Sequence, residues 1–228
     1  MAARDLITST QATAFAPPTA SVDATQLATC ITAASMAFEG MCGRRISKAT
    51  YTAALHSGDR SNHGQLYLAD PATGLRTGDI LQVTALTEDG TSLAAGTVVS
   101  GWGTGVSSST KVIVDRYTGV ASRIYYSSGS VYGTAWAAGV ANISFSYTAG
   151  YMPDPGGTPG TYDLAMPSDI TQAVCELTWL LYREGFRSGI QSLSGVGASS
   201  QFTRDLSPFA NTTIQAWVFD TYIRTLGP

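Results

Sequence analysis

Apolar side chains recur at helical spacing in two stretches of the chain. The first stretch alternates steps of four and three residues, which places its apolar residues on one helical face: Leu27, Ile31, Ala34, Phe38 and Met41. This helix should begin near Ser21 or Asp23 and end at Gly43, a natural helix stop. The second stretch repeats the spacing with Ile170, Val174, Leu177 and Leu181. Pro167 and Asp169 suit a helix that starts at Ser168, so two amphipathic helices with a shared core are predicted.

Between the helices the pattern changes to short β-branched or aromatic runs. They are separated by Gly, Asp and Ser and comprise Gln65–Ala69, Asp79–Leu86, Thr91–Val99, Lys111–Asp115, Arg123–Tyr126 and Val140–Tyr147. Asp89-Gly90 lies between two of these runs and predicts a tight hairpin turn. Several short strands at this spacing favour a small sandwich or barrel.

The order of these elements predicts an α+β protein with a discontinuous helical domain. Residues 21–45 and 163–228 should form a small helical bundle, and residues 46–150 an inserted antiparallel β domain. Residues 1–20, which are small and polar and include Pro17-Pro18, are expected to be an extended arm. Residues 151–167 form a Pro/Gly-rich loop and residues 188–207 a flexible Gly/Ser-rich loop. A last helix is expected from about Pro208 to Gly227, with Ile214, Trp217, Val218 and Tyr222.

Composition narrows the function classes. The chain of 228 residues has 13 Lys+Arg against 16 Asp+Glu, a net charge of −3, and only 13% charged residues. A disordered polyanion and a free-standing basic DNA binder are excluded. No apolar run reaches the about 18 residues that span a bilayer, and no signal-peptide pattern opens the chain, so we expect no membrane partner. Three widely spaced cysteines favour a reducing compartment. The scarcity of charge indicates surface that is buried in an assembly.

Candidate catalytic and metal-binding residues are few. His56, Asp59 and His63 could be taken for a metal cluster, but their spacing matches no helical ligand pattern and a polar turn is favoured. No phosphate-cradling loop, dinucleotide fingerprint or nucleophile elbow is present. We therefore expect no cofactor, no metal and no enzymatic activity.

Three fragments look like pieces of a chymotrypsin-like serine protease. They are Thr52–His56, Gly78–Leu81 and Ser100–Thr104, but the GDSGG segment that carries the nucleophile in that family is missing. Asp154 and Asp163 more simply shape a proline-rich loop than form a glycosidase pair. Trp136, Tyr125, Tyr126 and Tyr132 could form a sugar-binding platform or pack across strands. A secreted-type carbohydrate-binding module or serine hydrolase remains the alternative function.

Three groups of residues resemble the head–tail connector (adaptor) proteins of long-tailed bacteriophages. The first group is an opening helix with Asp23, Leu27, Ile31, Ala34 and Glu39, then Gly43-Arg44-Arg45-Ile46 and Tyr51. The second runs from Ile143–Tyr147 through Ala149-Gly150-Tyr151 to Met166-Pro167-Ser168-Asp169-Ile170 and ends at Leu181-Tyr182-Arg183-Glu184. The third is Arg204-Asp205-Leu206-Ser207-Pro208 before a helix with Tyr222 and Arg224. Together they cover about half of the chain, and the arm and residues 86–139 lie outside the resemblance.

The resemblance implies a structural virion protein and not an enzyme. Such a protein would form a ring of about twelve copies under the portal, at the virion neck, after assembly in the host cytoplasm. Its partners would be other copies of itself, the portal protein and a stopper or tail-terminator protein. A stopper role is the nearest variant, although the helix-rich ends favour an adaptor. Double-stranded DNA would pass through the lumen without tight binding, which a net-acidic chain suits.

Roles for individual residues follow from the resemblance. The family motif is carried by structural positions, namely Gly43, Arg44, Arg45, Gly150, Tyr151 and Pro167. The expected portal- or neighbour-binding residues lie toward the C-terminus: Arg183, Arg187, Arg204, Phe209, Trp217, Phe219, Tyr222 and Arg224. The arginines could instead cap helix ends in solvent. Aromatic residues dominate interface energetics, so the C-terminal region is the expected portal-binding element.

Overall fold

A computed structural model describes residues 4–16, 22–58, 64–93, 97–99, 109–128, 130–153, 164–187, 192–195 and 198–201. The protein is α+β and divides into two compact units. Unit 1 comprises Met1–Cys42 and Met166–Pro228, and unit 2 comprises Gly43–Ala165. For comparison, the sequence pattern placed the boundaries of the β insertion at residues 46 and 150.

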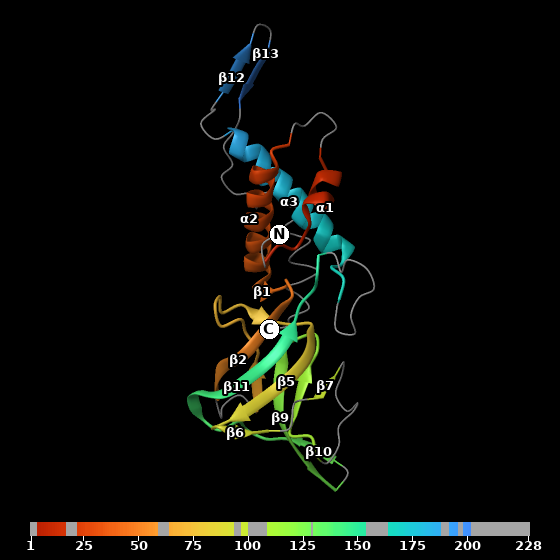
Figure 1. Ribbon diagram of the computed structural model, residues 1–228. Helices are drawn as coiled ribbons and strands as arrows, with labels where there is room; N and C mark the ends of the chain where they lie inside the picture. Colours follow the sequence, from red (N-terminus) through yellow and green to blue (C-terminus); the bar gives the residue numbers. More distant parts are fainter. Residues whose placement is uncertain are drawn as a thin grey trace. The chain divides into compact units, whose positions relative to one another are not determined.

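Unit 1 is built on two long helices, α2 (Ala24–Cys42) and α3 (Ser168–Arg187), which lie side by side (Figure 1). Asp23 caps α2, because its carboxylate accepts from the backbone N–H groups of Thr25 at 2.8 Å and Gln26 at 2.9 Å. The predicted apolar faces form the core of the unit. Its buried residues include Leu27, Ile31, Ala34, Phe38, Ile170, Val174 and Leu177. Both periodic helices are thus confirmed, while Met41 and Leu181 are half-buried.

The expectation of an N-terminal arm is wrong for the described part of residues 1–20. A short helix, α1 (Ser9–Ala14), follows Thr8, which forms a reciprocal capping box with Gln11. Leu6 and Ile7, just before it, are fully buried. The indole Nε1 of Trp179 on α3 donates to the Ala12 carbonyl at 2.7 Å. Two adjacent apolar residues are too short a pattern to predict a packed segment from the sequence. In the structure, Leu6 and Ile7 nevertheless hold this segment in the core.

The segment after α3 also differs from the expected loop. Two short strands, β12 (Ser192–Gly195) and β13 (Ala198–Gln201), pair antiparallel, and Ser192 lies opposite Gln201. Their Ser- and Gly-rich sequences lack the β-branched and aromatic residues that signal a strand. The predicted last helix from about Pro208 to Gly227 lies outside the described residues.

Unit 2 contains a four-stranded and a five-stranded β-sheet around one apolar core, and a third sheet of two short strands. The first sheet has the order β2 (Ala49–Gly58), β11 (Gly139–Ala149), β5 (Ile80–Glu88) and β6 (Thr91–Ser92). The second has β10 (Ser130–Gly133), β9 (Val120–Ser127), β8 (Val112–Asp115) and β7 (Thr97–Val99), and β3 (Gln65–Tyr67) also pairs with β9. The described pairings are antiparallel except for β7–β8 and for β1 (Arg44–Arg45) with β4 (Arg76–Thr77).

The core of unit 2 draws on both sheets and on the segments that connect them. Its largest buried side chains include Leu68, Ile80, Leu86, Trp136, Ile143, Phe145 and Tyr147. Asp89 and Gly90 both have positive φ and form the turn between β5 and β6, so the predicted hairpin is confirmed. The apolar runs indicated no strand at residues 49–58, although the family resemblance implies a strand that carries Tyr51. In the structure β2 pairs there along β11, with a bulge at Ala53.

Candidate functional site

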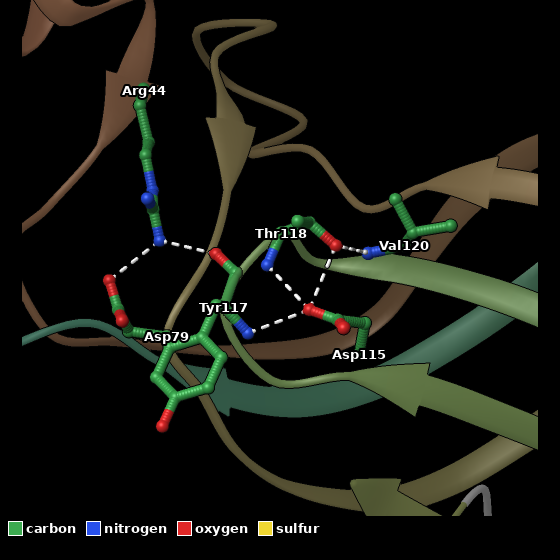
Figure 2. A network of polar contacts seen from close by, with 6 residues as sticks. All are labelled: Arg44, Asp79, Asp115, Tyr117, Thr118 and Val120. Carbon is green, nitrogen blue, oxygen red and sulfur yellow. Dashed lines mark hydrogen bonds and ion pairs between the residues drawn. The ribbon is translucent and has the colours of Figure 1, made fainter. Parts of the chain in front are cut away.

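Motif residues from two separate stretches of the chain, Arg44 and Gly150-Tyr151, come together around Asp79 in unit 2. Arg44 in β1 donates from Nη2 to the Asp79 carboxylate at 2.6 Å and to the Tyr117 carbonyl at 2.7 Å (Figure 2). Both side chains of the ion pair are nearly buried, with 13% and 11% exposed. A side chain at Gly78 would overlap the Arg44 guanidinium, which lies directly against that glycine. We call Arg44, Asp79 and Tyr151 the Arg44–Asp79 cluster.

A tight turn presents the carbonyl that Arg44 binds. Asp115, at the end of β8, accepts from the backbone N–H groups of Tyr117 at 2.9 Å and Thr118 at 2.8 Å (Figure 2). The Thr118 hydroxyl donates to the same carboxylate oxygen at 2.9 Å. Gly119 closes the turn with φ +67, and its bare Cα lies against the Thr77 carbonyl. The carboxylate therefore fixes the turn that completes the arginine's hydrogen bonds.

The second motif approaches Asp79 from the end of β11. The Gly150 N–H donates to the Asp79 carbonyl at 3.1 Å, and the Tyr151 N–H donates to the Ile46 carbonyl at 2.9 Å. The Lys48 N–H returns a bond to the Tyr151 carbonyl at 2.8 Å. Gly150 has φ +93, and a Cβ there would lie 2.6 Å from the Ile46 carbonyl oxygen. Glycine is required at this position because the two chain segments run in such close contact.

Burial sets the protonation of the cluster. Burial raises the pKa of the Asp79 carboxyl above its ordinary value, although Arg44, the Tyr151 hydroxyl and Arg116 each lower it. Burial likewise raises the pKa of the Tyr151 phenol, and the negative charge of Asp79 raises it further. Tyr151 is thus a neutral hydrogen-bond donor to Asp79 at physiological pH. The contacts of the Arg44–Asp79 cluster join separate chain segments, so the cluster stabilises the fold of unit 2.

The second motif arginine makes its own ion pair. Arg45 lies 3.7 Å from Asp70, and both side chains are 8% exposed. The Asp70 carboxylate also accepts from the Ala72 N–H at 2.8 Å, which holds the loop between β3 and β4. Gly43, which precedes the two arginines, has φ +62 at the end of α2. Pro167 immediately precedes α3, as the pattern predicts.

The structure gives no support to a protease or metal site in the part of the chain it describes. His56 on β2 packs edge-on against Phe145, with ring centroids 5.8 Å apart, and burial lowers its pKa. Asp79, from the second protease-like fragment, is paired with Arg44. Residues 100–104, Asp59, His63, Asp154 and Asp163 lie outside the described residues. Among those described, no group of three His, Cys, Asp or Glu could hold a metal ion.

The three cysteines are free thiols at different depths of burial. Cys30 is half-buried, and Cys42 and Cys175 are buried and free. Burial and the neighbouring Glu176 raise the pKa of the Cys175 thiol to about 11, and burial raises that of Cys30. No described helix is long and apolar enough to cross a membrane.

The aromatic residues of the proposed sugar platform separate in the structure. Trp136 is 1% exposed and packs edge-on against Phe145, so of the two uses considered for it, a sugar platform and internal packing, the structure shows packing. Tyr125 and Tyr132 are more than half exposed and lie directly opposite each other on β9 and β10. The Tyr126 side chain lies outside the described ones. Trp136 lies on the connection between β10 and β11, so its burial depends on the packing of the whole unit, whereas the exposure of the two tyrosines depends on strand pairing. The sequence pattern supplied neither.

Few of the expected partner-binding residues fall within the described chain. Arg183 is exposed on α3, and Arg187 is the last residue of that helix. The remaining six lie outside the described residues, namely Arg204, Phe209, Trp217, Phe219, Tyr222 and Arg224. Asp79 and Asp115, which the motifs depend on, were missed because single aspartates carry no periodic signal.

No family model and no curated protein matches this chain.

Proposed function

We propose that this protein is a head–tail connector of the adaptor type, a ring of about twelve copies that joins the portal vertex to the stopper or tail. The observation that carries this proposal is the exposed face of α2. Its exposed residues are all uncharged: Ala24, Thr25, Ala28, Thr29, Ala33, Met36 and Gly40. A helix face that meets bulk water normally carries charge, so this face suits burial against another chain.

The neighbouring helix provides the contrast. The exposed residues of α3 include Asp169, Glu176 and Arg183, which is the ordinary pattern of a solvated helix. The one charged residue of α2 is Glu39, which is buried and paired with Arg4 at 2.7 Å. The lack of charge thus distinguishes the exposed face of α2 from that of α3.

Unit 2 offers a second uncharged surface. On β2 the exposed residues are Thr50, Thr52, Ala53, Leu55 and Ser57, and Leu55 is 59% exposed. A closed ring uses heterologous contacts, so each copy needs two different contact surfaces. The exposed faces of α2 and β2 meet that requirement.

The Arg44–Asp79 cluster agrees with the resemblance to phage adaptors. The two motif groups, Gly43–Arg45 and Gly150–Tyr151, are distant in sequence and meet around Asp79. Residues that resemble one family and also form one contact network support a common origin of that network. We further propose that the C-terminal region binds the portal through Phe209, Trp217, Phe219, Tyr222 and Arg224, with Arg183, Arg187 and Arg204 flanking it. The net-acidic chain would let DNA pass without tight binding.

Native mass spectrometry of the chain, alone and mixed with the portal ring of the same phage, tests the proposal. We expect about twelve copies on the portal. The variant Ala33→Glu, which charges the exposed face of α2, should reduce the number of copies that bind. The control Gln172→Glu introduces the same charge on the already charged face of α3 and should leave assembly unchanged. A wild-type chain that stays monomeric and ignores the portal would contradict the adaptor function.

Truncation after Ser207 tests the portal-binding element separately. We expect the shortened chain to keep both compact units and to lose portal binding. Portal binding that survives this truncation would show that the C-terminal region is not the contact.

A further inference from the structure

The hairpin of β9 and β10 carries an exposed pair of aromatic residues. These residues belong neither to the Arg44–Asp79 cluster nor to the proposed ring contacts. In Figure 1 the hairpin lies at the end of unit 2 opposite β1. Tyr125 and Tyr132 face each other in register and are 53% and 54% exposed. The next pair on the same face, two residues along each strand, is Ser127 opposite Ser130. Ile124 and Val131 pack with Ile113 on the other face of the hairpin.

This face is uncharged. No residue from Ile124 to Gly133 carries a charge, in either strand or in the turn. The nearest charged side chain on the same face of β9 is Arg123, whose Nε donates to Glu88 at 3.2 Å and whose Nη1 donates to the Lys111 carbonyl at 3.2 Å. The residues of this face carry no charge and its nearest cation is already paired with Glu88, so the complementary ligand is neutral.

The exposed aromatic area distinguishes a small ligand from a protein partner. A tyrosine buries about 200 Å² when fully covered, so two half-exposed rings offer about 200 Å². A stable protein interface needs about 800 Å² on each partner. Two half-exposed tyrosines beside two serines suit one or two sugar rings, whose C–H groups pack on aromatic rings while their hydroxyls exchange hydrogen bonds with serine and tyrosine.

We propose that this face, defined by Tyr125, Ser127, Ser130 and Tyr132, binds a neutral pyranose oligosaccharide. The inference is independent of the adaptor function and would hold for a protein with any other role. It assigns to unit 2 a recognition surface at the end away from the Arg44–Asp79 cluster.

The test is a titration of the full chain with four neutral oligosaccharides, maltohexaose, cellohexaose, mannohexaose and chitohexaose, followed by saturation-transfer NMR and calorimetry. Hexagalacturonate serves as the charged comparison. We expect at least one neutral probe to bind with a dissociation constant of about 1 mM or tighter and the charged probe to bind more weakly. Absence of binding by all four neutral probes would overturn the proposal.

Variants locate the site. Tyr125→Ala and Tyr132→Ala should each weaken binding about tenfold, whereas Tyr132→Phe should keep most of it because the ring remains. The matched control is Tyr117→Ala, which removes a tyrosine that is 55% exposed on the turn after β8. Unchanged binding in Tyr125→Ala with an unchanged melting curve would overturn the proposal. A self-association in sedimentation velocity that Tyr125→Ala abolishes would also overturn it, because the face would then contact a second copy.

Discussion

The guanidinium of Arg44 donates to the carboxylate of Asp79 at 2.6 Å, and both side chains are almost excluded from solvent. The pair spans 35 positions of the sequence and lies where the chain enters unit 2. Tyr151, just after the end of β11, hydrogen-bonds to the same carboxylate. The start of unit 2 and the segment after its last strand are thus joined through one aspartate, and this relationship leads to the first three predictions.

Removal of the arginine should cost more than removal of an ordinary surface charge. Arg44→Ala leaves the nearly buried Asp79 without its ion-pair partner, and we expect a loss of about 3 kcal/mol in the free energy of unfolding. Lys111→Ala removes an exposed cation at the other end of β8 and should change stability by less than about 0.5 kcal/mol. Urea denaturation of both variants measures the difference. Equal stabilities would contradict a stabilising role of the Arg44–Asp79 cluster.

The pH dependence should carry the sign of a carboxyl whose pKa is raised by folding. Burial raises the pKa of Asp79 in the folded state, so ionised Asp79 opposes folding. Its contribution to stability is fully present below the ordinary carboxyl pKa of about 4 and is lost as pH rises through the raised value. The substitution Asp79→Asn should remove that part of the pH dependence. Asparagine also tolerates the positive φ of 51° at this position. Denaturation of both proteins across mildly acidic pH checks the sign.

A matched pair of glycine substitutions tests the close approach at the end of β11. Gly150→Ala adds a methyl group against the Ile46 and Ser47 carbonyls at a positive φ, and we expect a loss of about 3 kcal/mol. Gly74→Ala has φ +71 but no atom within 4 Å, so it should lose only about 1 kcal/mol. Thermal unfolding compares the two, and a smaller effect at Gly150 would contradict the contact geometry.

The N-terminal segment should depend on one side chain of α3. Trp179→Phe keeps most of the packing but removes the hydrogen bond from Nε1 to the Ala12 carbonyl. We expect a loss of about 1 kcal/mol and faster amide exchange confined to residues 6–12. Exchange that accelerates equally throughout α2 would show instead that the substitution disturbs the whole helical unit.

Unit 2 should fold without the helices. Residues 43–165 contain their own buried core, and the Arg44–Asp79 cluster joins the start of the unit to the residues just after β11. We expect the excised fragment to unfold cooperatively and to lose that cooperativity on Arg44→Ala. Circular dichroism and calorimetry measure both, and a fragment without a cooperative transition would contradict the independence of the unit.

The sequence alone determined the elements whose signals are local. The spacing of Leu27, Ile31 and Phe38 predicted α2, the residues around Pro167 predicted the start of α3, and Asp89-Gly90 predicted the turn between β5 and β6. Helical periodicity and turn chemistry are set within a few residues, so they are visible in the chain itself.

Tertiary structure decided the features that depend on distant segments. Leu6 and Ile7 are buried because α2 and α3 provide a surface for them. Trp136, on the connection between β10 and β11, is buried because it packs in the core of unit 2, while Tyr132 is exposed on the β9–β10 hairpin. The meeting of Arg44, Asp79 and Tyr151 required the whole β unit to form. Long-range contacts arise from the packing of complete elements, so no local pattern in the sequence could specify them.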